Sequence, residues 1–198
     1  MKHLTLLAAM ALTTGAFAQR TAISTGHPVH VNIFNAERTP TDTLVGASLA
    51  NPNSTLTLYF AGADASAGYV VGTNQYGDKA KVQVFTSTGN VLVEQLIYIF
   101  AAKDEAGAPS SAIHARIYGL DGAGTNAAGT TINTAPGSVL GNVDIAISAC
   151  DTTNLTIANF SPAIAVSGNF AGGFDVSDLA TGVALGLAST TDGDPGSS

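Results

Sequence analysis

The segment Ala112-Ile113-His114-Ala115-Arg116-Ile117-Tyr118 alternates apolar and polar side chains without a break. Because successive side chains of a β-strand point to opposite faces, this pattern predicts a strand with both isoleucines and Ala115 on one face. The other face carries His114, Arg116 and Tyr118. This second face is polar, so we expect it to meet water and to be a surface where a ligand can bind.

The same alternation recurs along the chain and predicts about nine short strands. They cover residues 29–34, 54–60, 81–85, 91–100, 112–118, 139–147, 155–160, 163–170 and 183–188. Turn-forming residues such as Asn51-Pro52-Asn53, Asp121-Gly122 and Thr134-Ala135-Pro136-Gly137 separate them, and no crossover helix is indicated between them. Strands without helices to cover them must bury sheet against sheet. The predicted fold class is therefore all-β, an antiparallel β-sandwich of the jelly-roll type.

One predicted strand differs from the others because both of its faces are apolar. Residues 91–100 read Val-Leu-Val-Glu-Gln-Leu-Ile-Tyr-Ile-Phe, with only Glu94 and Gln95 as charged or amide side chains. Strands that are covered on both faces typically show such continuous apolar runs. The pattern therefore predicts a central strand that other elements cover on both sides.

Length and charge limit the classes of protein to consider. The 198 residues match one domain, and the 45% share of hydrophobic residues argues against disorder. Fourteen acidic side chains face seven basic ones, which gives a formal net charge of −7. A chain of this charge repels nucleic acid and anionic lipid, so we expect no nucleic-acid partner.

The N-terminus has the pattern of an export signal. Lys2 is followed by an apolar stretch over 4–12 and by the small-x-small sequence Ala16-Phe17-Ala18. We therefore expect 1–18 to be a signal peptide, 19–43 a lead-in segment or edge strand, and 44–198 the β-sandwich domain. No apolar run approaches the ~20 residues that span a bilayer, so we expect a secreted, extracellular or cell-surface protein without a membrane-spanning segment.

Several segments resemble a known family. Gly68-Tyr69-Val70-Val71-Gly72-Thr73-Asn74-Gln75-Tyr76-Gly77-Asp78-Lys79-Ala80-Lys81 and the later Ser189-Thr190-Thr191-Asp192-Gly193-Asp194 are the most specific, and Ala135-Pro136-Gly137-Ser138-Val139-Leu140 is a weaker match. Together they resemble a β-sandwich module of proteins that Bacteroidota export through the type IX secretion system. The resemblance covers about 68–194 and implies a fold and an extracellular location, with no established catalytic residues.

The same resemblance bears on the C-terminus and on the function. Members of the family continue into a Trp-containing strand and a C-terminal sorting domain. The present sequence reaches Ser198 before either of them and contains no Trp. The expectation is a sandwich domain that is truncated at its C-terminal end, within a non-catalytic module that serves adhesion, spacing or ligand presentation.

Five aspartates are candidates for a structural calcium site, because Ca²⁺ takes six to eight oxygen ligands from flexible loops. They are Asp78, Asp175, Asp178, Asp192 and Asp194. Their spacing fits no EF-hand loop, and Asp beside Gly also forms ordinary turns. Asp78 has a second alternative, which is an ion pair with Lys79 or Lys81. No other cofactor is indicated.

The remaining chemistry-bearing residues give weaker signals. His27 and His30 would need further ligands from elsewhere to hold zinc. Cys150 ends an apolar alternation and has no partner for a disulfide, so a buried thiol is predicted. Without a Gly-x-Ser-x-Gly elbow or another nucleophile motif, we expect no enzyme. A small secreted hydrolase whose catalytic carboxylates follow no recognised motif is a further hypothesis.

Carbohydrate binding is the alternative function, with or without calcium, in support of polysaccharide degradation. Sugar-binding β-domains use exposed aromatic side chains that stack on pyranose rings. Trp is absent, so Tyr69, Tyr76 and Tyr118 are the candidates, of which Tyr76 can equally pack its own loop. The expected ligand-binding set is Tyr76, His114, Arg116 and Tyr118, and the expected partner is a glycan or a surface protein.

Overall fold

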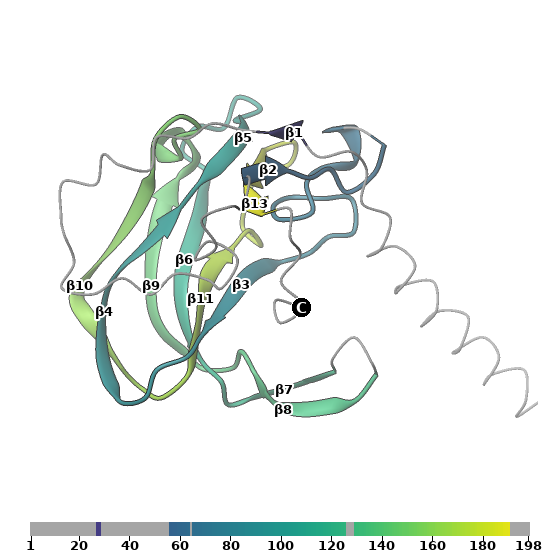
Figure 1. Ribbon diagram of the computed structural model, residues 1–198. Helices are drawn as coiled ribbons and strands as arrows, with labels where there is room; N and C mark the ends of the chain where they lie inside the picture. The colour runs from purple at the N-terminus through teal and green to yellow at the C-terminus, as the bar shows by residue number, and fades with distance from the viewer. Residues whose placement is uncertain (1–26, 29–55, 64, 126–128, 191–198) are drawn as a thin grey trace, which may run out of the picture.

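The computed structural model describes residues 27–28, 56–63, 65–125 and 129–190. In chain order, its elements are β1 (His27–Pro28), β2 (Leu56–Leu58), η1 (Ala65–Ala67), β3 (Ala80–Phe85), β4 (Asn90–Tyr98), β5 (Phe100–Asp104), β6 (Ala112–Gly119), β7 (Gly122–Thr125), β8 (Thr131–Ala135), β9 (Val139–Ala146), η2 (Ile147–Ala149), β10 (Thr156–Ser167), β11 (Phe170–Asp175), β12 (Ala184–Leu187) and β13 (Ser189–Thr190). Figure 1 shows their arrangement.

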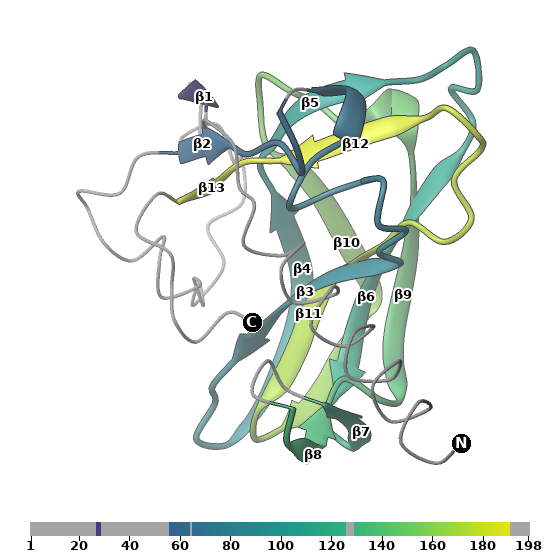
Figure 2. The ribbon, with the colours of Figure 1, turned by 90° about the vertical axis from the view of Figure 1, so that its right-hand side faces the viewer.

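The largest sheet has four antiparallel strands in the order β3-β11-β6-β9. β4 pairs with β10 in a second, two-stranded sheet, which Figure 1 shows to the left of the first. Three small sheets complete the structure, namely β1-β2-β13, β5-β12 and β7-β8. Figure 2 shows that the β7-β8 hairpin and the β5-β12 pair lie at opposite ends of the molecule.

The two larger sheets share one core. The Tyr98 hydroxyl of β4 donates a hydrogen bond of 2.8 Å to the Gly173 carbonyl of β11. Tyr98, Phe100 and Phe174 form an aromatic cluster with ring centroids 5.6–5.7 Å apart. The apolar face of β6 is buried in the same core. The structure thus confirms the all-β class with antiparallel sheets, while the sandwich closure and its jelly-roll form stay predictions.

The middle strand β11 departs from the sequence expectation, because the predicted strand over 163–170 stops where β11 begins. Gly172 and Gly173 lower the β-propensity of this segment, so the pattern gave little signal. The structure leaves no room for a side chain at Gly173 and little room at Gly172. A Cβ on Gly173 would lie 2.0 Å from the Lys81 carbonyl oxygen, and one on Gly172 would lie 2.9 Å from Leu96 Cδ2. The absence of side chains allows β3 and β4 to approach β11 closely.

Three other strand expectations change. The predicted strands over 155–160 and 163–170 are one strand, β10, whose register shifts between Asn159 and Ile164. The segment 91–100 is divided between β4 and β5. Within the described residues, β4 pairs with β10 alone, and Leu92 and Ile97 are 68% and 39% exposed. The prediction that this strand is covered on both sides was therefore wrong.

The predicted signal peptide over 1–18 and the lead-in over 19–43 lie outside the described residues, apart from the backbone of β1. Within the described part of the chain, no helix combines the length and the apolar character needed to cross a membrane.

Candidate functional site

The outer face of the four-stranded sheet gathers charged side chains from three neighbouring strands. Antiparallel pairing sets His114 of β6 opposite Asp175 of β11 on one side and opposite Asp144 of β9 on the other. One step along β6, Arg116 lies opposite Asn142. Opposite residues in adjacent strands point to the same face, so the pairing register alone brings these groups together.

His114 contacts a carboxylate with each of its ring nitrogens. Nδ1 lies 2.7 Å from Asp144 Oδ1, and Nε2 lies 3.0 Å from Asp178 Oδ2 in the turn that follows β11. A neutral imidazole carries one N–H, whereas an imidazolium carries two, so the charged form alone can donate to both carboxylates. Asn142 Nδ2 donates to the same Asp144 oxygen over 2.8 Å.

Arg116 links the neighbouring strands beside His114. Its NH1 group donates to Asp175 Oδ2, and its Nε donates to Asn142 Oδ1 over 3.0 Å. The other oxygen of Asp175 accepts from the Ser177 backbone N–H over 2.7 Å. Only 11% of the Asp175 side chain is exposed. The carboxylate is therefore held from two directions, by a cation and by a backbone donor. We call the groups of His114, Arg116, Asp144, Asp175 and Asp178 the charged network.

The pKa directions follow from this geometry. The hydrogen bond that His114 donates to Asp144 is the main cause that raises the pKa of His114 above 6.5, and the same bond lowers the pKa of Asp144. Burial acts to raise the pKa of Asp175, but the bonds from Ser177 and the charge of Arg116 outweigh it and hold that pKa below 3.8. At neutral pH the Asp144 and Asp175 carboxylates are therefore ionised, and the hydrogen bond to Asp144 favours the charged form of His114.

Because the folded state raises the pKa of His114, we expect the protein to lose stability as the pH rises through that value. The contribution of His114 is complete below its ordinary pKa of 6.5 and disappears above the raised pKa of the folded state. Urea unfolding of the wild type and of His114→Gln, compared from about pH 5.5 to about pH 9, measures this contribution. The difference between the two proteins should shrink toward alkaline pH. A constant difference would contradict the network.

The five calcium candidates do not form one cluster within the described residues. Asp78 pairs with Lys81, as one of the alternatives predicted, and it also accepts from Asn74 Nδ2 over 3.1 Å. Asp175 and Asp178 pair with the cations of the charged network. Among the described residues, no group of three His, Cys, Asp or Glu side chains is arranged to hold a metal ion.

Two of the calcium candidates, and one of the two histidines considered for zinc, lie outside the described residues. These are Asp192, Asp194 and His30, and only the backbone of His27 is described. Calcium binding stays a prediction that concerns these carboxylates.

The aromatic candidates for sugar stacking are engaged with the protein itself. The Tyr76 hydroxyl donates to the Ala61 carbonyl over 2.6 Å, which fits the alternative in which Tyr76 packs its own loop. The Tyr118 side chain follows Arg116 on the outer face of β6, and the residue is buried. Tyr69 lies against Phe60 with ring centroids 5.8 Å apart.

Cys150 is fully buried, as the sequence predicted. Burial raises the pKa of its thiol to about 11, so very little thiolate is present at neutral pH.

We therefore expect the Cys150 thiol of the folded protein to react with a disulfide reagent at about pH 8 at least a hundredfold more slowly than in urea. The reaction is followed by the absorbance of the released thiol. Equal rates in the folded and unfolded protein would show that the thiol is accessible.

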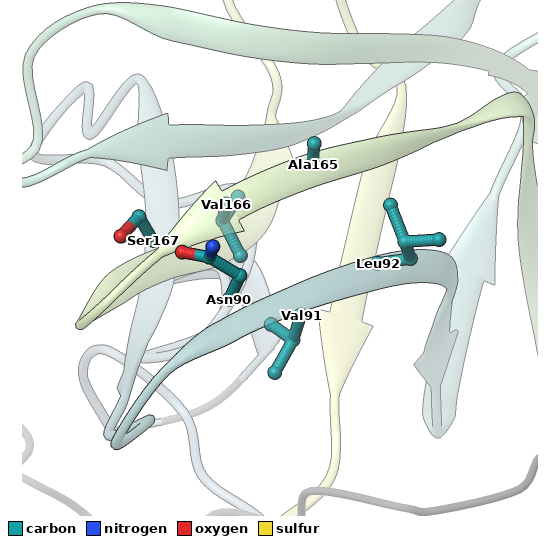
Figure 3. A pocket seen from close by; sticks show the side chains of 6 residues that line it. All are labelled: Asn90, Val91, Leu92, Ala165, Val166 and Ser167. Atoms are coloured by element: carbon teal, nitrogen blue, oxygen red, sulfur yellow. The ribbon is translucent and has the colours of Figure 1, made fainter.

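A shallow, uncharged groove lies between the start of β4 and the end of β10 (Figure 3). Its lining residues are Asn90, Val91, Leu92, Ala165, Val166 and Ser167. It offers apolar contacts, one amide and one hydroxyl group. None of the candidate residues predicted from the sequence lies in this groove.

Asp144 and Asn142 are members of the site that the sequence analysis missed. Both lie in the predicted strand over 139–147, where they alternate with Val143 and Ile145. That alternation had the same form as the one in β6, so it marked a second polar face. What it could not supply was the register that sets Asp144 opposite His114.

Comparison of the chain with protein-family models, with curated proteins and with solved structures finds no match.

Proposed function

We propose that this chain is a non-catalytic β-sheet module of a secreted or cell-surface protein, serving adhesion, spacing or ligand presentation. The observation that carries the proposal is that both ring nitrogens of His114 are occupied by carboxylates. A catalytic histidine needs one nitrogen directed at a substrate or a nucleophile. His114 instead ties β6 to β9 and to the turn after β11, which is a structural task.

Two further observations support the proposal. Arg116 is held between Asp175 and Asn142, so it is not directed outward at an anionic ligand. Cys150, the single cysteine of the chain, is buried and has a raised pKa. The predicted export signal over 1–18 and the resemblance to type IX secretion cargo modules support the proposed extracellular location.

Turnover assays test the absence of catalysis. The wild type and His114→Gln are compared on a panel of chromogenic esters, aryl glycosides and a labelled protein substrate. We expect no turnover above the buffer rate for either protein. Turnover by the wild type that His114→Gln loses while remaining folded would overturn the proposal, since it would make His114 a catalytic residue.

Carbohydrate binding stays the alternative prediction, and calorimetry separates it from the first. The protein is titrated with soluble polysaccharides in the presence of calcium and then of a chelator. The proposed function predicts no heat of binding in either buffer. Saturable binding that Tyr76→Phe retains and Tyr76→Ala loses would instead favour a carbohydrate-binding module, because the ring and not the hydroxyl would then be responsible.

A further inference from the structure

Residues 176–182, which we call the strap, lie in the connection between β11 and β12 (Figure 2). Two of its side chains, Val176 and Leu179, are partly buried and pack against the core that the larger sheets share. A side chain of β6 holds the strap from outside, since His114 Nε2 lies 3.0 Å from Asp178 Oδ2. The strap therefore covers part of the core and depends on His114 for its position.

The contact between His114 and Asp178 depends on a proton. Nδ1 of the same ring lies 2.7 Å from Asp144 Oδ1, so the ring has a carboxylate at each nitrogen. A neutral imidazole has a single N–H, and an ionised carboxylate accepts hydrogen bonds but cannot donate them. When the ring loses a proton, one of the two carboxylates therefore faces an unprotonated nitrogen and is repelled by its lone pair.

Asp144 is the carboxylate that keeps its hydrogen bond. Its contact with the ring is the shorter one, and Asn142 Nδ2 donates to the same oxygen over 2.8 Å. Strand pairing also fixes Asp144 of β9 directly opposite His114 of β6. Asp178 lies in the strap and its side chain is 73% exposed, so it can turn into water. The proton on Nε2 is therefore the one that is lost, and the strap is the element that is released.

Charged groups face His114 from the strands that pack around it. Arg116 follows on the same face of β6, β9 contributes Asp144 and β11 contributes Asp175. Arg116 stays charged, and the hydrogen bonds that Asp144 and Asp175 accept hold their pKa values below 3.8. The ion pairs on the next elements are Lys81 with Asp78 and Lys103 with Glu105. The group in contact with the strap that changes its charge near neutral pH is therefore His114.

We propose that the strap is a pH-sensitive device, which His114 holds through Asp178 while the ring is charged and releases when Nε2 loses its proton. Release lets Val176 and Leu179 leave the core, so the surface at the strap changes with pH. This device is additional to the proposed function and does not depend on it.

NMR relaxation of the Ala180 methyl carbon tests the proposal, from about pH 6 to about pH 9. Ala180 lies in the strap, where its N–H donates to Ser111 Oγ over 2.9 Å, and an alanine methyl is attached directly to Cα, so it reports backbone motion. Its order parameter should fall from about 0.85 to below about 0.6 as the His114 ring titrates in the same samples. Ala115, which is buried in β6, is the internal control and should stay near about 0.85.

Two variants make the test specific. In Asp178→Asn the amide accepts from the charged ring through its oxygen and donates to the unprotonated Nε2 through its nitrogen, so the strap should stay ordered over the whole range. Thr181→Asn is the matched control, because it adds an amide to the strap and leaves Asp178 in place, so its strap should loosen like that of the wild type. The proposal fails if the wild-type Ala180 methyl keeps its order through the His114 titration. It also fails if Asp178→Asn loosens as the wild type does.

Discussion

Phe174→Ala is expected to lower the free energy of unfolding by about 3–5 kcal/mol. Phe174 is 1% exposed, and its ring makes edge contacts with Tyr98 of β4 and Phe100 of β5. The substitution removes one of the largest side chains of the core and leaves a cavity between the two sheets. Both the lost burial and the cavity add to the cost.

Phe85→Ala is the control for this prediction. Phe85 stacks on Phe170 with ring centroids 5.3 Å apart, but it is only half-buried near the end of β3. We expect about half the cost of Phe174→Ala, because part of the ring already meets water. Urea unfolding at neutral pH measures both variants. If Phe174→Ala costs no more than Phe85→Ala, the aromatic cluster does not join the sheets as described.

Asp175→Ala is expected to cost about 2–3 kcal/mol. The change leaves the guanidinium of Arg116 without its carboxylate and the Ser177 N–H without its acceptor. A fully buried pair would cost more, but Arg116 is one quarter exposed and can recover part of its hydration. The lowered pKa of Asp175 sets the pH window. Its contribution is present above pH 3.8 and disappears as the pH falls through the lower pKa of the folded state.

Two variants make the Asp175 prediction specific. Asp175→Asn keeps an acceptor for the Ser177 N–H and should cost less than Asp175→Ala. Asp178→Asn alters a carboxylate that is 73% exposed, so we expect a cost under about 1 kcal/mol. Unfolding in urea near neutral pH compares the three. Equal costs for the substitutions at 175 and 178 would show that burial does not decide the strength of these pairs.

The fold was predictable where alternation is strict and the side chains are large. The segment 112–118 has the pattern of a strand with one apolar face, and β6 is such a strand, with Ile113 and Ile117 fully buried. β11 escaped prediction because two of its residues are glycines, whose role is to admit neighbouring strands rather than to fill space. The hairpin β7-β8 was expected only as turns, since its Gly, Ala and Thr residues show little hydrophobic periodicity.

The candidate site was predictable residue by residue but not as one assembly. From the sequence, His114 and Arg116 were predicted to belong to a ligand-binding surface, and Asp175 and Asp178 to a calcium site. In the structure these four residues contact one another across sequence separations of 59 and 64 residues. The register between β6 and β11 brings these side chains together. Register depends on the pairing of whole strands. The pattern of a single strand does not contain it.

The most direct test of the account is an NMR titration of the His114 ring nitrogens with pH, in the absence of calcium and with about 10 mM calcium. If the charged network is structural, the pKa at which the ring loses its second proton lies above 6.5, both nitrogens bear protons below that pKa, and calcium leaves it unchanged. A pKa at or below 6.5 would contradict the network. A pKa that calcium lowers would show that Asp144 or Asp178 binds the metal in place of the imidazolium.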